Sequence, residues 1–284
     1  MAKSGCIVVL LDSSPASEAA LATAARFAHY RDLELVGLFI EERDLLDLAA
    51  HPFAREISAL SGISRPFDSE ALRSRLELQR RRIEQRLKDA AGALSLRWSL
   101  HVQAGSVLEA LARPGIRTEL LFLGKTGWSG NRGSRLGSSA AQALFTSGWN
   151  IVLSGAIPKT VAGVVQALIT EASSGPAVVR LAVAMAEATD RPLRLLFAPT
   201  IDQTVERSIL DPLLAHTGKA TTGLAPALTI EHLRDATSDT LRQLLARSPG
   251  SELVMARSAP SRLGCDLLEL LSLTDAGVAV VSDT

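Results

Sequence analysis

The sequence has little of what several protein classes require. It contains two cysteines, Cys6 and Cys265, in 284 residues, and neither belongs to a CxxC pair or to a Cys/His cluster with zinc-site spacing. Aromatic residues make up only 4% of the chain. We therefore expect a core of Ala, Leu, Val and Ile, a mixture that favours helices packed on buried parallel strands.

Net charge and long apolar runs are also lacking. Lys plus Arg and Asp plus Glu number 30 each, so the formal net charge is zero and nothing overall favours a nucleic acid or an anionic membrane as partner. No apolar stretch reaches the roughly 18 residues of a transmembrane helix, and the first residues do not have the pattern of a signal peptide. We expect a cytoplasmic protein with no nucleic-acid and no membrane partner.

Short apolar runs alternate with helical patterns through the first half of the chain. The β-branched run from Cys6 to Leu11 predicts a buried strand, and Ser14 and Pro15 suit the cap and the first turn of a following helix. Further strands are expected at 33–40, 96–103, 119–124 and 150–154, with helical segments between them. This alternation predicts a parallel sheet with helices on both faces.

A less regular segment interrupts this pattern. Residues 41–67 contain two prolines in their second part and predict a mixture of short helix and loop. Residues 68–93 predict a long helix that is capped by Asp68 or Ser69. Between 69 and 91 this helix is rich in arginine, which suits either a solvated face or a docking surface for an acidic partner. The role of this helix stays open.

The second half repeats the plan of the first. Strands are expected at 161–169, 191–199, 228–233, 252–257 and 278–282, and ELLFLG and NIVLS of the first half match ELVMAR and VAVVS of the second. A repeat of this length indicates duplication of a whole domain. We expect two tandem doubly wound α/β domains, 1–155 and 156–284, each a five-stranded parallel sheet flanked by helices.

A glycine-rich loop, residues 123–139, follows the fourth strand. Ligands of doubly wound sheets bind at the carboxyl ends of strands, near the reversal of strand order. Glycines allow close backbone approach, and exposed amides beside a helix N-terminus attract phosphate oxygens. Lys125, Arg132 and Arg135 add positive charge, and Ser138 and Ser139 suit hydroxyl donors that also cap the next helix. The loop predicts a phosphate-binding site.

The spacing in this loop resembles the universal stress protein family, whose ATP-binding members carry the pattern G-x2-G-x9-G-(S/T). The matching residues are Gly124, Gly127, Gly137 and Ser138, and they lie between the fourth strand and the fourth helix, as in that family. Many members have a His-Gly pair in the loop, whereas this sequence has Thr126 before Gly127. The resemblance covers residues 4–155 well, and the second half only in architecture.

The resemblance implies that the first half binds ATP, with magnesium near Asp12. The amides of Gly127 and Gly137 and the hydroxyl of Ser138 would hold phosphates. Asp12 would face the ribose or the metal, and Phe39 would line the adenine pocket. The expected site also includes Ser13, Gly124, Lys125, Arg135 and Ser139.

Simpler explanations for these residues stay open. Asp12 also suits a structural acid at a helix start, and Phe39 also suits the core. The loop itself would serve equally as a flexible surface turn. For the whole protein, the two functions to be weighed are an ATP-binding regulator of the stress response, with at most slow ATP hydrolysis, and a non-catalytic scaffold or interaction module with a vestigial site.

The second half lacks the corresponding residues. Thr170 stands where the first half has Asp12, and the loop after the fourth strand contains a single glycine, Gly264. We expect no nucleotide there. By the resemblance, the fifth strands of the two halves would pair within one chain, 150–154 against 278–282. A homodimer and an unidentified protein partner are left open.

Overall fold

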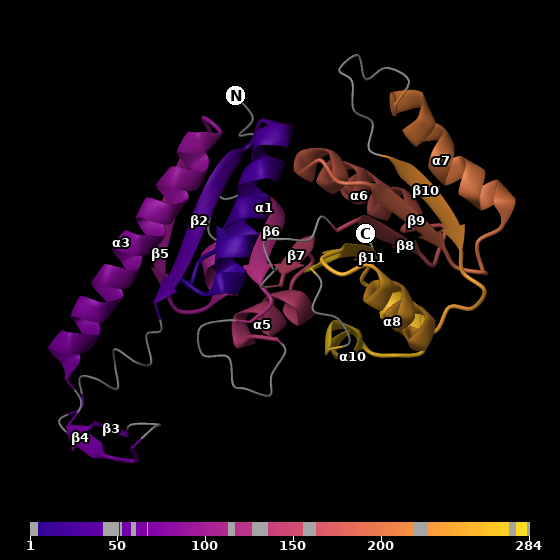
Figure 1. Cartoon of the computed structure of the whole chain (residues 1–284). Helices are drawn as coiled ribbons and strands as arrows, with labels where there is room; N and C mark the ends of the chain where they lie inside the picture. The colour runs from indigo at the N-terminus through magenta and orange to yellow at the C-terminus, as the bar shows by residue number, and fades with distance from the viewer. Residues whose placement is uncertain are drawn as a thin grey trace.

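The computed structural model of the 284-residue chain describes residues 5–41, 51, 53–57, 61–66, 68–112, 117–126, 136–155, 163–217, 227–272 and 277–282. Ten strands form one sheet in the order β10-β9-β8-β11-β12-β7-β6-β1-β2-β5. Two further strands, β3 and β4, pair only with each other in the described part of the chain. Figure 1 shows the long sheet with helices on both faces. The expected α/β fold class is confirmed.

The first half supplies β1 to β7. Its elements are β1 (Cys6–Leu10), α1 (Pro15–Arg31), β2 (Glu34–Glu41), β3 (Arg55–Ile57), β4 (Ser64–Pro66), α3 (Ser69–Ala93), β5 (Trp98–Ala104), α4 (Val107–Leu111), β6 (Thr118–Gly124), α5 (Ser138–Thr146) and β7 (Ile151–Ser154). Within the sheet they run β5-β2-β1-β6-β7, and all neighbours are parallel. The strand order therefore reverses between β1 and β6.

The second half repeats this order. Its elements are β8 (Val165–Ile169), α6 (Gly175–Thr189), β9 (Leu193–Phe197), α7 (Gln203–Thr217), β10 (Leu228–His232), α8 (Ser238–Arg247), β11 (Glu252–Ala256), α9 (Ala259–Arg262), α10 (Leu267–Ser272) and β12 (Gly277–Val281). They run β10-β9-β8-β11-β12 with parallel neighbours, so the order reverses between β8 and β11.

The two halves meet through their fifth strands. β12 pairs antiparallel with β7, with Ala279 opposite Val152, which confirms the expected pairing within one chain. On one face α1 packs against α6, and Tyr30 donates a hydrogen bond to Glu187 across the contact. The linker 156–160 lies outside the described residues, so the division at residue 155 stays a prediction.

Each face of the sheet has its own apolar core. Alternate strand residues such as Ile7 and Phe122 pack under α1, α3, α6 and α7, whereas Val8 and Leu121 pack under α4, α5, α8 and α10.

Cys6 lies in the second of these cores, and burial raises its pKa to about 11, so the thiol stays protonated at neutral pH. Both cysteines are free thiols, and among the described residues no helix is long and apolar enough to cross a membrane.

Local capping follows the sequence. The Ser14 hydroxyl accepts from the Ser17 amide, and Pro15 opens α1. Asp68 accepts from the Ala71 amide at the start of α3, as one of the two expected caps. The helix α1 ends at Asp32, which adopts the left-handed conformation that closes many helices.

The expected mixture of helix and loop between 41 and 67 is wrong where the structure describes this segment. Arg55–Ile57 and Ser64–Pro66 form an antiparallel hairpin, and the Arg55 guanidinium bonds the Ser64 hydroxyl at 2.9 Å. Gly62, with φ +67°, turns the chain just before β4, which few other residues do at low cost. Strands of three residues are too short to show a period-two pattern, so sequence reasoning missed them.

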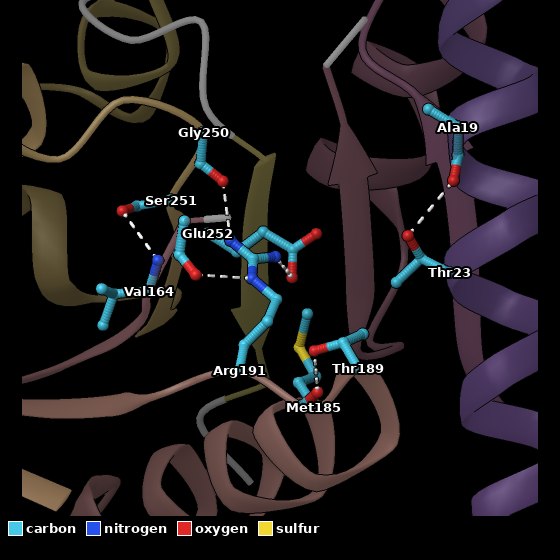
Figure 2. A network of polar contacts seen from close by, with 10 residues as sticks. Ala19, Thr23, Val164, Met185, Thr189, Arg191, Gly250, Ser251 and Glu252 are labelled. Carbon is cyan, nitrogen blue, oxygen red and sulfur yellow. Dashed lines mark hydrogen bonds and ion pairs between the residues drawn. The ribbon is translucent and has the colours of Figure 1, made fainter. Parts of the chain in front are cut away.

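A buried ion pair lies at the amino edge of the second half (Figure 2). Arg191 lies 3.2 Å from the Glu252 carboxylate and donates to the carbonyl oxygens of Gly163 and Gly250 at 2.9 and 2.6 Å. Burial raises the pKa of Glu252, and the charge of Arg191 offsets part of that rise. The pair holds the start of β11 to the end of α6.

Candidate functional site

The loops after β1 and β6 meet at the point where the strand order reverses. The Ser14 hydroxyl donates to the Thr126 carbonyl across this junction, at 3.4 Å. Doubly wound sheets bind ligands in this crevice because the connections leave β1 and β6 toward opposite faces. The structure therefore brings Asp12, Ser13, Gly124 and Lys125 to one edge of the sheet, as the sequence predicted.

The loop after β1 is fixed by its own polar groups. Asp12 accepts from the Ser14 amide at 2.9 Å, and the Asp12 amide donates to the Ser17 hydroxyl at 3.2 Å. The structural role for Asp12 at a helix start is therefore present. A role toward ribose or magnesium stays a prediction, and the described residues contain no cluster of three or more potential metal ligands.

A side chain from α3 also holds this loop. Gln79 donates from Nε2 to the Asp12 carbonyl at 3.0 Å. Sequence reasoning missed Gln79, because it lies 67 residues from Asp12 and in a helix that gives no signal of the contact. The bond ties the position of α3 to the backbone of the candidate site.

Ser13 carries the strain of this loop. Its φ of +64° is rare for a residue other than glycine, and its hydroxyl is buried without a hydrogen-bond partner in the described part of the chain. Ser13 also borders a groove of about 560 Å³ between α1 and α3, with Leu21 and Ile83 among the lining residues. The unusual backbone is tolerated because three hydrogen bonds hold its neighbour Asp12.

Gly124 has a packing role of its own. A Cβ atom at this position would lie 2.9 Å from the Ser17 amide nitrogen and 3.1 Å from Ala16. The end of β6 thus approaches α1 more closely than any side chain permits. The need for glycine at this position is explained without a ligand, whose contact with Gly124 stays a prediction.

The two described ends of the glycine loop are joined. The Lys125 amide donates to the carbonyl oxygen of Ser154, and the Lys125 carbonyl accepts a hydrogen bond from the Gly137 amide at 2.9 Å. Lys125 is only 4% exposed, so its ammonium lies inside the protein rather than in solvent. Gly127, Arg132 and Arg135 lie outside the described residues, and their part in phosphate binding stays a prediction.

The start of α5 differs from the sequence expectation. Gly137 is the N-cap, with no side-chain cap bond, and Ser138 and Ser139 are the first residues of the helix itself. The expectation that these serines cap α5 is wrong, because the chain enters the helix one residue earlier. The amides of the first turn thus receive no side-chain cap, a geometry that favours an anion.

Phe39 faces the core rather than the crevice. It is 3% exposed and packs with Leu87 on the α1–α3 face, which is the core role that the sequence left open. Because side chains alternate along a strand, its neighbour Ile40 faces the other side, half-buried in the same cluster as Leu10 and Leu136. Ile40 is the apolar side chain nearest the carboxyl end of β2 on the α5 face. A backbone contact from Phe39 to adenine stays a prediction.

The corresponding edge of the second half is closed by charged side chains. Glu171, after β8, accepts hydrogen bonds from Ser258 and, at 3.1 Å, from Arg262. The bond from Ser258 and then that from Arg262 lower the pKa of Glu171, so it is ionised at neutral pH. Arg257 follows β11 as Lys125 follows β6, and it donates to the carbonyls of Leu144 and Trp149 in the first half.

Comparison with known proteins identifies the fold. The sequence matches no protein-family model and no curated protein. The structure is similar to a universal stress protein from Archaeoglobus fulgidus, with a TM-score of 0.61 and 13% identity over 99% of this chain and 100% of that one. The chain has the universal stress protein fold.

Two further solved structures share this fold. A putative universal stress protein from Pseudomonas aeruginosa has a TM-score of 0.55 and 13% identity, over 97% of this chain and 92% of that one. The cytoplasmic domain of a prokaryotic cation chloride cotransporter has a TM-score of 0.52 and 13% identity, over 99% and 97%. Because the fold occurs both in stress proteins and in a transporter domain, it does not by itself name the function.

Proposed function

We propose that the first half binds an adenine nucleotide, ATP with magnesium, at the carboxyl ends of β1 and β6, and that the protein is a regulator of the universal stress protein type. The observation that carries this proposal is the bond between the Lys125 carbonyl and the Gly137 amide. This bond joins the two described ends of a loop that has the family's glycine spacing. One end lies at the β1–β6 crevice, and the other lies at the uncapped start of α5.

In this proposal the triphosphate lies against the first turn of α5. Ser138, which is exposed, and the amides beside it donate to the phosphate oxygens. Asp12 is the carboxylate at the end of β1, and Mg²⁺ typically uses one or two carboxylates together with substrate phosphates and water. Any slow hydrolysis would depend on Asp12 through a water bound to that metal.

The second half holds no nucleotide in this proposal. Glu171 and Arg262 bond each other at the β8–β11 edge, where a phosphate would meet the negative charge of Glu171. The second half instead completes the sheet through β12 and contributes Arg257 to the junction with α5.

The test uses one substitution at two matched positions. Ser138→Asp puts a carboxylate in the first turn of α5, where it favours the helix but repels phosphate. Ser238→Asp makes the same change at the first residue of α8, in the second half. Calorimetric titration with Mg-ATP is expected to show at least about tenfold weaker binding, roughly 1.4 kcal/mol, for Ser138→Asp and unchanged binding for Ser238→Asp.

A non-catalytic scaffold with a vestigial site is the second candidate. It is favoured by the internal engagement of Asp12 with Ser14 and by the burial of Lys125. A ligand that binds only the folded state raises stability, by about 2.7 kcal/mol at a hundredfold excess over Kd. An unchanged melting temperature in millimolar Mg-ATP would therefore decide for the scaffold.

A further inference from the structure

A groove lies between α1 and α3, on the opposite face of the sheet from α5. Its volume is about 560 Å³, within the range of roughly 300–1,000 Å³ that small-molecule sites span. Among the described residues, its lining comes from α1, α3 and the segment 11–13 between β1 and α1, and none comes from β6 or α5. The groove is therefore distinct from the phosphate position proposed at the start of α5.

Part of the groove is apolar. Leu11, Leu21 and Ile83 line it, and all three are buried members of the core on this face of the sheet. The methylene groups of Arg82 and Arg86 add apolar surface on the α3 side, because long charged side chains lay their stems along apolar neighbours. The apolar body of a ligand in the groove would continue the core and leave water.

The charged side chains of the groove are engaged, with one exception. Arg86 lies 3.6 Å from the Glu18 carboxylate, and Asp89 accepts a hydrogen bond from Gln85 at 2.7 Å. Arg82 is exposed and forms no ion pair or hydrogen bond with another described residue. Asp89 lies seven residues further along α3, roughly 10 Å away, so salt screens much of its effect on Arg82. The groove thus offers one positive charge to a ligand.

Ser13 adds a hydrogen-bonding group at the same end of the groove as Arg82. Gln79 donates to the carbonyl of Asp12, the neighbour of Ser13, and Arg82 follows Gln79 by about one helical turn. Helix side chains tilt toward the N-terminus, so Arg82 leans toward this end. The Ser13 hydroxyl is buried without a partner among the described residues, and a φ of +64° is strain of the kind that gathers at ligand clamps.

We propose that this groove binds a small amphipathic carboxylate, with an aliphatic body against Leu21 and Ile83 and its head group at Arg82 and Ser13. The planar guanidinium of Arg82 donates to both carboxylate oxygens, and a rotation about χ1 lets the Ser13 hydroxyl donate to one of them. The ligand thereby satisfies a hydroxyl that the described part of the chain leaves unpaired.

Other ligand classes fit the groove less well. A phosphate ester carries close to two negative charges at neutral pH, and Arg82 compensates only one of them. A cation would have to displace Arg86 from Glu18 or Gln85 from Asp89. An uncharged molecule would leave the head-group contacts unmade. A single negative charge on an aliphatic body is the chemistry that uses the whole groove.

The experiment is calorimetric titration of the full chain with decanoate, a linear aliphatic carboxylate, up to about 1 mM and without nucleotide. The wild type is expected to bind decanoate at least about tenfold more tightly than decanol, which lacks the charge. Arg82→Gln is expected to weaken decanoate binding at least about tenfold. Arg73→Gln is the matched control, because Arg73 is also exposed and unpaired among the described residues of α3 but lies outside the groove. It is expected to bind like the wild type.

Methyl NMR locates the bound decanoate. The signals of Leu11, Leu21 and Ile83 are expected to shift when decanoate is added, because these side chains line the groove. The signal of Ile40 is expected to stay in place, because Ile40 lies on the other face of the sheet, near the carboxyl end of β2. Shifts centred on Ile40 would move the ligand out of the groove and overturn the proposal.

Ser13→Gly tests the second head-group contact. Glycine keeps the φ of +64° without strain and removes the hydroxyl, so decanoate binding is expected to weaken about three- to fivefold without a lower melting temperature. Absence of decanoate binding, decanol binding as tight as decanoate, unchanged binding in Arg82→Gln or an equal loss in Arg73→Gln overturns the proposal. None of these outcomes depends on whether the protein binds Mg-ATP.

Discussion

The two halves share a strand order but differ at both edges of the sheet. At the carboxyl edge, the first half ends β6 in Gly124 and a long glycine loop, whereas the second half brings Glu171 and Arg262 together. At the amino edge, Ile7 pairs with Leu120 in the first half, and the equivalent Val165 pairs with Glu252 in the second. The second half thus carries a charged pair at each edge of its sheet, where the first half has a glycine loop at one edge and apolar residues at the other.

The amino edges show how a buried position changes without a change of fold. Leu33 follows the left-handed residue after α1, as Arg191 follows the one after α6. Leu33 and Leu120 pack in the core of the first half, where the second half has the pair Arg191 and Glu252. Because Arg191 lies 3.2 Å from the Glu252 carboxylate and donates to two backbone carbonyls, the charged pair and the apolar pair both support the same strands.

The largest expected effect comes from breaking this pair. Arg191→Leu leaves the Glu252 carboxylate buried without its cation, and we expect a loss of about 3–5 kcal/mol in the free energy of unfolding. Adding Glu252→Leu copies the apolar pair of the first half and is expected to restore stability to near the wild-type value or above it. Urea unfolding of the two variants measures this. A double variant no more stable than the single one would contradict the comparison.

Gly124 and its counterpart Ala256 provide the next test. Gly124→Ala pushes a Cβ to 2.9 Å from the Ser17 amide nitrogen, and we expect a loss of about 1–3 kcal/mol. Ala256→Gly at the matched end of β11 is expected to cost only about 0.5–1 kcal/mol, from backbone entropy. Thermal unfolding compares them. Equal losses at both positions would show that β6 does not need its glycine for close approach to α1.

The next largest expected effect is the pH dependence of the free energy of unfolding that comes from the Arg191–Glu252 pair. Burial raises the folded-state pKa of Glu252 above its unfolded value, so its contribution to stability is largest below the unfolded pKa and is lost as the pH rises through the folded pKa. Arg191→Leu removes the offsetting charge and is expected to widen this loss, by about 1.4 kcal/mol for each further pKa unit. Urea midpoints at acidic and neutral pH measure it. A penalty for Arg191→Leu that is the same at both pH values would contradict the assignment.

The smallest expected effect concerns Gln79 and rests on the proposed function. Gln79→Leu removes the bond to the Asp12 carbonyl, and we expect about fivefold weaker Mg-ATP binding, for a bond worth about 1 kcal/mol. Gln85→Leu, on the same helix but bonded to exposed Asp89, is the control. Amide hydrogen exchange at Ser14 and Ser17 gives a second measurement that needs no nucleotide. Unchanged exchange in Gln79→Leu would remove Gln79 from the site even if ATP binds.

Much of the fold could be predicted because its signals are local. The buried strands are short β-branched runs, and α1 begins where Ser14 and Pro15 indicate it. Repetition of the pattern indicated two matching halves. The hairpin of β3 and β4 could not be predicted, since three-residue strands have no periodicity, and Gly137, rather than Ser138 or Ser139, is the N-cap of α5.

The candidate site was predictable as a location but not in its contacts. The glycine spacing placed it after β6, and the structure brings the described part of that loop beside Asp12. The bond from Gln79 and the inward position of Phe39 depend on how α3 packs on the sheet, which no spacing encodes. Gly127 and Arg135 lie outside the described residues and stay predictions.

The sequence by itself determined the ten strands of the long sheet, most of the helices between them and the repeated strand order, because each depends on neighbouring residues and their period. The pairing of β7 with β12 was expected only from the resemblance, and the tertiary structure confirms it. Only the tertiary structure decided that Lys125 is buried and that the close approach of α1 requires a glycine at position 124. These features arise between segments distant in the chain, where packing and close approach, rather than local preference, select the arrangement.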